Sequence, residues 1–224
     1  MKNWAKGALA IAGLALFTTT ASALPLRSPQ VVFNYAPLQG YLNVVDSGIN
    51  VATDQLDAQV WSVSITGNTD FTLMLESPIG AGNSVGVYNG PAAVPVLFQV
   101  FPGAAGPGWF ATLHFGGGNL IVTLFDQNSV IQGQNFYAGV NQNAFGFYTQ
   151  GPCGLWFSQD FRNPNPQILS YASNDLPGDY WVCFEACQYG AASTFNGVVI
   201  NIQSVRPTPV APTSWGKLKA IYNK

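Results

Sequence analysis

The stretch that decides the fold of this chain is Asp179–Gln188, Asp-Tyr-Trp-Val-Cys-Phe-Glu-Ala-Cys-Gln. Side chains alternate between the two faces of a β-strand, so Tyr180 and Phe184 would lie on one face. Trp181 and Glu185 would then lie on the other. Both faces are largely apolar, and the glutamate is the only charge inside the run. The pattern therefore predicts a strand that is covered on both sides rather than a half-exposed strand.

Runs of alternating apolar and polar residues, separated by turn residues, continue through most of the chain. Val60–Ile65 and Phe71–Glu76 flank Thr66–Thr69, and we expect them to form an antiparallel hairpin. A second hairpin is expected where Trp109–Phe115 and Asn119–Phe125 flank three glycines. The other predicted strands are Val31–Tyr35, Tyr41–Val45, Ser84–Tyr88, Val96–Phe101, Phe145–Thr149, Leu155–Ser158, Gln167–Ala172 and Asn196–Val205.

Length and composition fit one β-domain rather than two small ones. About ten to twelve short strands at this spacing are typical of a β-sandwich or jelly roll. Charged residues make up only 8% of the chain, against about a quarter in an average protein. Residues 24–205 are therefore predicted to form a single all-β domain, an antiparallel two-sheet sandwich. The domain has no basic stripe, which argues against nucleic-acid binding.

The first 23 residues have the pattern of a signal peptide. Lys2 and Lys6 precede a short apolar run, and Ala21 and Ala23 form a small-residue cleavage site before Leu24. The apolar run is too short to span a bilayer, and no later stretch approaches the roughly 18 apolar residues of a transmembrane helix. We therefore expect an exported protein, secreted or held at the cell surface, without a transmembrane segment.

Three cysteines, Cys153, Cys183 and Cys187, fit an oxidising compartment. One disulfide among them would leave one free thiol, and three pairings are open. On a continuous strand Cys183 and Cys187 would lie roughly 13 Å apart, beyond disulfide reach. They can pair only if the chain turns after Glu185; otherwise Cys153 is the partner of one of them. A zinc site is the weaker interpretation, because no suitably spaced histidine accompanies the cysteines.

The end of the chain differs from the domain in composition. Residues 206–212 are Pro-rich and are predicted to form an extended linker. Residues 213–224 could form a short basic amphipathic helix, which needs a surface or a partner to be stable. We interpret this segment as a sorting or anchoring tag; a frayed tail is the alternative. The residues that define the tag are Trp215, Gly216, Lys217, Leu218 and Lys219.

Few residues of the chain could carry chemistry. His114 is the only histidine, and no Gly-x-Ser-x-Gly elbow accompanies it, so a structural role is expected. Glycoside hydrolysis needs two carboxylates, and Glu185 is the best candidate for an acid with a perturbed pKa. A carboxylate that caps a turn or accepts hydrogen bonds from backbone N–H groups is the favoured interpretation of Glu185. Trp109, Trp156 and Trp181 could stack against sugars but are better explained as core residues.

Seven short pieces occur in an order that marks a resemblance: Ser84–Tyr88, Val96–Phe101, Asn143–Tyr148, Leu155–Ser158, Ile168–Tyr171, Tyr180–Glu185 and Gly197–Ile200. An Ala-Phe-Gly-Phe-Tyr element and a Tyr-x-x-x-Phe-Glu element are the most specific among them. With these pieces, Ser84–Val205 resembles a bacterial domain of unknown function. That family is common in exported proteins that carry C-terminal sorting tags of the Pro-Glu-Pro type.

Departures from the family pattern concern acidic residues and the tail. The family's further acids near the Phe-Glu element imply a calcium-assisted turn. Here Ala186 follows Glu185, and Ser193–Asn196 stands where the acidic run would be. Only Glu185 is retained, so we expect no cofactor, and the missing acids weaken the case for calcium. The tail has neither Pro-Glu-Pro nor a hydrophobic helix, so it would be a different kind of tag.

These observations predict an exported β-sandwich with a structural or binding role and no evident catalysis. Its partners would be a surface glycan, a cell-surface protein or further copies of the chain. One alternative is a jelly-roll enzyme that acts on glycans through Glu185. Another is a self-assembling extracellular coat or filament subunit, because low charge and amide-rich surfaces favour lateral contacts.

Overall fold

The computed structural model describes residues 24–64, 67–77, 80–187, 190 and 192–208. Within them, thirteen strands form two antiparallel sheets that face each other across an apolar core. The predicted all-β sandwich is therefore confirmed. The predicted leader and the predicted C-terminal tag lie outside the described residues. Among the described residues, no helix has the length and apolar character needed to cross a membrane.

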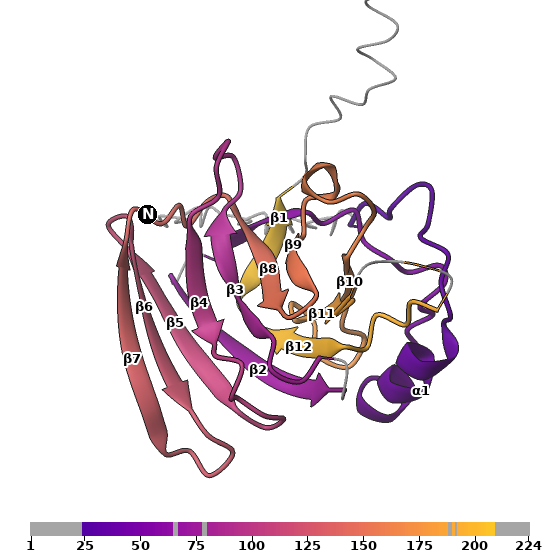
Figure 1. Cartoon of the computed structure of the whole chain (residues 1–224), viewed down its shortest axis with the longest axis horizontal. Helices are drawn as coiled ribbons and strands as arrows, with labels where there is room; N and C mark the ends of the chain where they lie inside the picture. The colour runs from indigo at the N-terminus through magenta and orange to yellow at the C-terminus, as the bar shows by residue number, and fades with distance from the viewer. Residues whose placement is uncertain (1–23, 65–66, 78–79, 188–189, 191, 209–224) are drawn as a thin grey trace, which may run out of the picture.

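One sheet has six strands, in the order β13-β1-β8-β3-β4, with β9 paired to β8. The other has seven strands, in the order β10-β11-β12-β2-β5-β6-β7. In Figure 1 the strands β5, β6 and β7 lie at one end of the molecule, and the helix α1 lies at the other. The strands of the six-stranded sheet are β1 (Val60–Val63), β3 (Ser84–Asn89), β4 (Leu97–Phe101), β8 (Phe145–Gly151), β9 (Gly154–Phe157) and β13 (Val205–Thr208). The seven-stranded sheet contains β2 (Asn68–Glu76), β5 (Phe110–Gly116), β6 (Asn119–Phe125), β7 (Ile131–Ala138), β10 (Ile168–Ala172), β11 (Tyr180–Phe184) and β12 (Val198–Ile202).

Strand β11 is covered on both sides, as its sequence predicts. Tyr180, Val182 and Phe184 belong to the core between the two sheets. Trp181 and Cys183 belong to a second apolar cluster, on the outer face of the seven-stranded sheet. All five residues of the strand are buried. The strand is shorter than predicted and ends at Phe184, although the Glu185 N–H still donates a hydrogen bond to the Gln167 carbonyl, at 2.8 Å.

The second cluster exists because the N-terminal part of the domain folds over the outer face of β10, β11 and β12. Its helix α1 (Ala36–Val45) begins with a proline in the first turn, where proline's missing N–H costs nothing. Leu38 and Leu42 are one turn apart and fully buried against the sheet. The prediction that Tyr41–Val45 is a strand is therefore wrong. The apolar side chains of this segment follow the 3.6-residue period of a helix rather than the two-residue period of a strand.

The predicted strand Val31–Tyr35 is also wrong, although its alternation of burial is right. Val31 and Phe33 are buried in the second cluster, but the segment pairs with no strand in the described chain. A side chain takes the place of the neighbouring strand. The Gln55 amide accepts a hydrogen bond from the Val31 N–H at 2.7 Å and donates one to the Val31 carbonyl at 2.9 Å.

One predicted hairpin is wrong and the other is confirmed. Strand β1 pairs with β8 and β13, whereas β2 pairs with β5 and β12, so the chain crosses between the sheets where a hairpin was expected. Strands β5 and β6 do form a hairpin, and Gly117 and Gly118 in its turn have φ values of 59° and 78°. These positive angles are the reason that glycine is needed there.

The last predicted strand, Asn196–Val205, is two strands in different sheets. Strand β12 ends at Ile202, and Ser204, with a φ of 54°, lies where the chain crosses to β13. Strand β13 pairs with β1 and includes the first three residues of the predicted linker, Arg206–Thr208. Strand β7 was not predicted at all, because its polar residues hide the alternation.

Candidate functional site

Glu185, the residue that the sequence favours as a functional acid, holds a turn. It follows β11 directly and is only 7% exposed. Its Oε2 atom accepts hydrogen bonds from the backbone N–H groups of Thr194, at 2.8 Å, and Phe195, at 3.1 Å. A carboxylate bonded to two backbone N–H groups is a structural acceptor, as expected from the sequence.

The turn that Glu185 holds has an unusual backbone. Phe195 has a φ of 51°, in the left-handed region that bulky residues avoid. Its ring is fully buried in the second cluster, with its centroid 4.8 Å from that of Phe33. Glu185 therefore stabilises a backbone conformation that presses an aromatic ring onto the covering segment.

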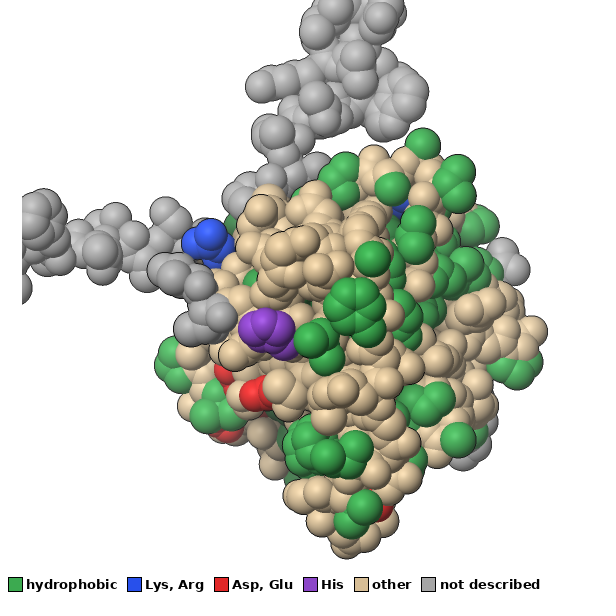
Figure 2. Space-filling model, turned by 90° about the vertical axis from the view of Figure 1, so that its left-hand side faces the viewer, with side chains coloured by type: hydrophobic (Ala, Val, Ile, Leu, Met, Phe, Trp, Pro, Cys, Tyr) green, Lys and Arg blue, Asp and Glu red, His purple; other side chains and the backbone are tan. Residues whose placement is uncertain are grey.

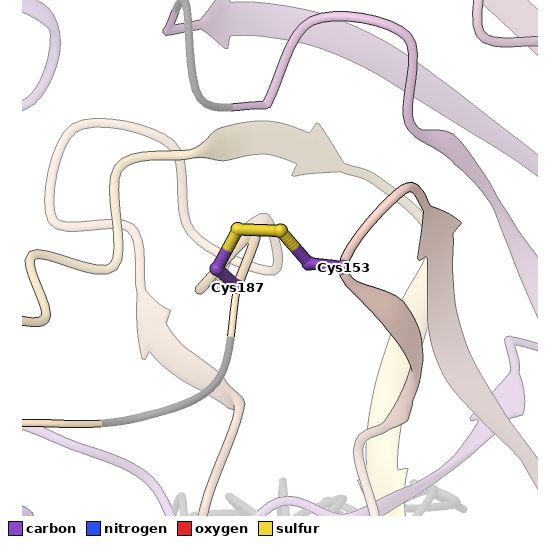
Figure 3. Close-up of a disulfide and its surroundings, with 2 residues drawn as sticks. All are labelled: Cys153 and Cys187. Carbon is purple, nitrogen blue, oxygen red and sulfur yellow. A yellow bond between two sulfur atoms is a disulfide. The ribbon is translucent and has the colours of Figure 1, made fainter.

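The three cysteines divide into one disulfide and one buried thiol. Cys153, in the turn between β8 and β9, is bonded to Cys187, with the two Cα atoms 5.0 Å apart (Figure 3). The bond joins a turn of one sheet to the segment after β11 of the other, so it links the two layers. Burial raises the pKa of the Cys183 thiol, which is 0% exposed. A buried neutral thiol of this kind is a core residue rather than a nucleophile.

A second buried carboxylate, which the sequence did not reveal, fixes the helix to the sheet. Asp46, at the C-terminal end of α1, is 2% exposed. Its Oδ2 accepts a hydrogen bond of 2.6 Å from Trp181 Nε1, and its Oδ1 accepts one of 3.1 Å from the backbone of Asn174. Trp181 is therefore part of the scaffold. Trp109 packs against the core between the sheets and Trp156 lies on β9, so the three tryptophans occupy three separate places.

A cleft of about 590 Å³ lies beside the first described residues. At its side the Arg27 Nη1 and Asp160 Oδ2 atoms are 2.5 Å apart, and Arg27 is only 8% exposed. Burial raises the pKa of Asp160, and the Arg27 guanidinium opposes this rise. Within the described residues, three buried atoms of the lining have no hydrogen-bond partner: Arg27 Nε, Gln30 Oε1 and Asp160 Oδ1.

Another arginine is fully engaged in holding a loop. Arg162 donates hydrogen bonds to the carbonyls of Gly90 and Ala92 and to Gln159 Oε1. Its guanidinium carbon lies 5.5 Å from the centre of the Tyr88 ring. The Tyr88 ring therefore already has a cation of the same chain, Arg162, over its face.

The most exposed surface of the sheet is the outer face of β2, β5, β6 and β7, which we call the bare face. Within the described chain, the second cluster contains no residue of β5, β6 or β7. Phe136 on β7 is 65% exposed, and Ile131 on the same strand is 63% exposed. The bare face is defined by the outward-pointing residues Asn68, Asp70, Thr72, Phe110, Thr112, His114, Asn119, Ile121, Thr123, Phe125, Ile131, Gln134, Phe136 and Ala138.

Apolar and amide side chains share the bare face. Phe110 and Phe125 stack across neighbouring strands, with ring centroids 4.7 Å apart. His114, predicted to be structural, is exposed and is hydrogen-bonded to Asn68 on the next strand. Figure 2 shows the histidine beside hydrophobic side chains on a surface that is mostly polar and uncharged. Such a face can bind by contact, because exposed apolar groups beside hydrogen-bonding side chains are typical of interaction surfaces.

Comparisons with protein-family models, with curated proteins and with solved structures found no match. The resemblance of residues 84–205 to an exported-protein domain therefore stays a prediction, and function has to be argued from geometry. Within the described residues, no group of three or more His, Cys, Asp or Glu side chains is arranged to hold a metal ion. The tag residues Trp215, Gly216, Lys217, Leu218 and Lys219 lie outside the described residues.

Proposed function

We propose that this protein is an exported β-sandwich that works by contact rather than by turnover, and that the bare face is its contact surface. The observation that carries the proposal is that one half of the outer face of the seven-stranded sheet is covered by the chain itself and the other half is not. The chain covers the outer face of β10, β11 and β12 with its own N-terminal segment but leaves the outer face of β5, β6 and β7 uncovered within the described residues. Uncovered apolar residues such as Phe136 have a cost in water unless a partner covers them.

The arrangement of the acids supports a role without catalysis. Glu185 is buried, and its carboxylate is occupied by two backbone N–H groups. Asp46 is occupied in the same way by Trp181 and Asn174. A general acid or nucleophile must reach a substrate atom, and neither Glu185 nor Asp46 lines either of two clefts found in the described part of the chain.

The proposal is tested by the retention of the exported protein on washed cells. Thr112→Glu with Thr123→Glu places two charges in the middle of the bare face. Val44→Glu with Val94→Glu is the control, since these two valines are 84% and 80% exposed elsewhere. We expect the bare-face variant to be released into the medium while the control stays on the cells. Equal retention of both variants would contradict the proposal.

Activity screening provides an independent test. The purified protein would be incubated with a panel of polysaccharides, beside Glu185→Gln. We expect no turnover by either protein. Polysaccharide cleavage that is lost in Glu185→Gln would overturn the proposal in favour of the glycan-active enzyme.

A further inference from the structure

A further feature of the seven-stranded sheet is its edge strand β7, which pairs on only one side among the described residues. We infer that two copies of the chain join antiparallel, β7 to β7, so that the two seven-stranded sheets become one continuous sheet and their bare faces one continuous surface. The inference rests on the proposed function in one respect, since β7 borders the bare face. It stands or fails on different measurements.

The backbone of β7 is paired on one side only. It pairs with β6 from Asn119↔Ala138 to Phe125↔Ile131, and within the described residues no strand pairs with its other side. The register shifts between Leu124 and Phe125, so the regular part of the strand is residues 133–138. An edge of this kind presents a row of unpaired N–H and C=O groups, which is a template for a strand of another chain.

Apart from the irregularity at its first end, strand β7 lacks the charged residues and prolines that protect many sheet edges. Its eight residues include no Lys, Asp, Glu or Pro. Two of the other sheet edges, β13 and β10, are different. Strand β13 has only four residues and contains Arg206 and Pro207. Strand β10 already accepts a hydrogen bond from the Leu56 N–H at the Ser170 carbonyl, at 2.9 Å.

Charge also favours β7 as the meeting point of two copies. The described residues contain all ten acids of the chain but only three arginines, Arg27, Arg162 and Arg206, which gives a net charge of −7. Two such domains repel each other over most of their surface. The carboxylate nearest to β7 in sequence, Asp126, is occupied within its own turn by the N–H groups of Asn128 and Val130. Strand β7 itself contains no charged residue, although the Asp126 carboxylate also accepts a hydrogen bond from Gln132, near its first end, at 2.9 Å.

A two-fold axis perpendicular to the sheet makes this pairing self-complementary. If the axis passes beside Asn135, that residue faces Asn135 of the second copy, and two amides can hydrogen-bond to each other. Gln134 then faces Phe136 of the second copy, on the same side of the sheet. The outward Ile131 and Phe136 side chains, 63% and 65% exposed, become parts of an apolar strip that runs across both copies.

The strength of the contact follows from its size. Six regular residues provide about six backbone hydrogen bonds between the copies. The interface is small, so we expect a reversible dimer with a dissociation constant on the order of 100 µM. Such a dimer is populated where export concentrates the protein, for example at a cell surface.

The test is sedimentation of the mature full-length chain at concentrations up to about 1 mM. Wild type should show a concentration-dependent mass that approaches two chains. Asn135→Lys places two like charges opposite each other and should weaken the dimer about tenfold or more. Asn43→Lys, the same substitution at an exposed position of α1, should leave it unchanged. A wild type that stays monomeric, or a dimer that survives Asn135→Lys unchanged, would overturn the inference.

A cross-linking experiment tests the register independently of folding differences. Cys183 is buried and the other two cysteines form a disulfide, so Asn135→Cys adds an accessible thiol. A short bismaleimide should join two Asn135→Cys chains far more efficiently than two Val94→Cys chains. Equal cross-linking would contradict the pairing. The two proposals can also fail separately. If the Thr112→Glu, Thr123→Glu variant is lost from cells while the wild type is monomeric in sedimentation, the proposed function stands and the dimer is rejected.

Discussion

The two halves of the seven-stranded sheet differ in how much of their outer face is buried under the N-terminal segment of the chain. Both halves have apolar residues on both faces. On the outer face of β11, Trp181 is 4% exposed and Cys183 is 0% exposed, whereas on the outer face of β7, Phe136 is 65% exposed. The outer side chains also differ in kind, since Leu169, Trp181 and Val199 are apolar. Thr112, His114 and Gln134 on the bare face are polar, so the covering segment and the side chains together account for the difference.

Polar side chains hold that covering segment in place. Gln55, Asp46 and Glu185 are buried and hydrogen-bond to backbone or indole N–H groups on or beside the cover. On the bare face the polar pairs, such as Gln134 with Thr123, join neighbouring strands of the sheet instead. The covered half is therefore built as scaffold, and the bare half is left available for contact.

The largest expected difference between the halves is in stability. Leu42→Ala removes a fully buried side chain from under α1 and should lower the free energy of unfolding by about 2–5 kcal/mol. Phe136→Ala, on the bare face, should change it by only about 0.5 kcal/mol. Urea unfolding of both variants measures the difference. Similar losses in the two variants would mean that the bare face is part of the folded core.

A smaller effect is expected where a polar side chain holds the cover. Asp46→Ala leaves the Trp181 indole N–H and two backbone N–H groups without their acceptor, which should cost about 1–3 kcal/mol. The matched change on the bare face is Asp70→Ala, an exposed aspartate of β2. We expect no measurable loss from it in the same urea experiment. An Asp46→Ala variant as stable as Asp70→Ala would refute the anchoring role.

Alkaline pH should weaken the domain, in part through two tyrosines of the covered half. Burial raises the pKa of Tyr41 to about 12, from an ordinary value of 10.0, and raises that of Tyr171 well above the ordinary value. The folded state then holds protons that the unfolded state releases. Stability is fully present below pH 10 and falls as the pH rises toward 12. Tyr41→Phe should flatten the decline measured by urea unfolding between pH 9 and 12; an unchanged slope would contradict this assignment.

Much of the scaffold could be predicted because its signals are local. The alternation in Tyr180–Phe184 predicted a strand with two covered faces, and three adjacent glycines predicted the β5–β6 hairpin. The sequence predicted one disulfide but left its pairing open, with Cys153 as a partner only if Cys183 and Cys187 did not pair; the structure pairs Cys153 with Cys187.

The rest depends on contacts that are distant in sequence. Asp46 meets Trp181 across 135 positions, and Arg27 meets Asp160 across 133. No local pattern reveals such pairs. Helix α1 was missed because a short amphipathic segment with a glycine can be read with either period. The hairpin expected between β1 and β2 failed because a turn sequence does not say whether the next strand joins the same sheet.

The central claim is the proposal that a partner covers the bare face when the protein is on cells. Hydroxyl-radical footprinting of the protein on intact cells, compared with dilute purified protein, measures this directly. Phe136 and Phe161 are 65% and 73% exposed and provide the matched pair, since Phe161 lies outside the bare face in the short helix η1 (Asp160–Arg162). We predict that Phe136 loses reactivity on cells while Phe161 keeps it. Equal reactivity of Phe136 in both samples would contradict the account.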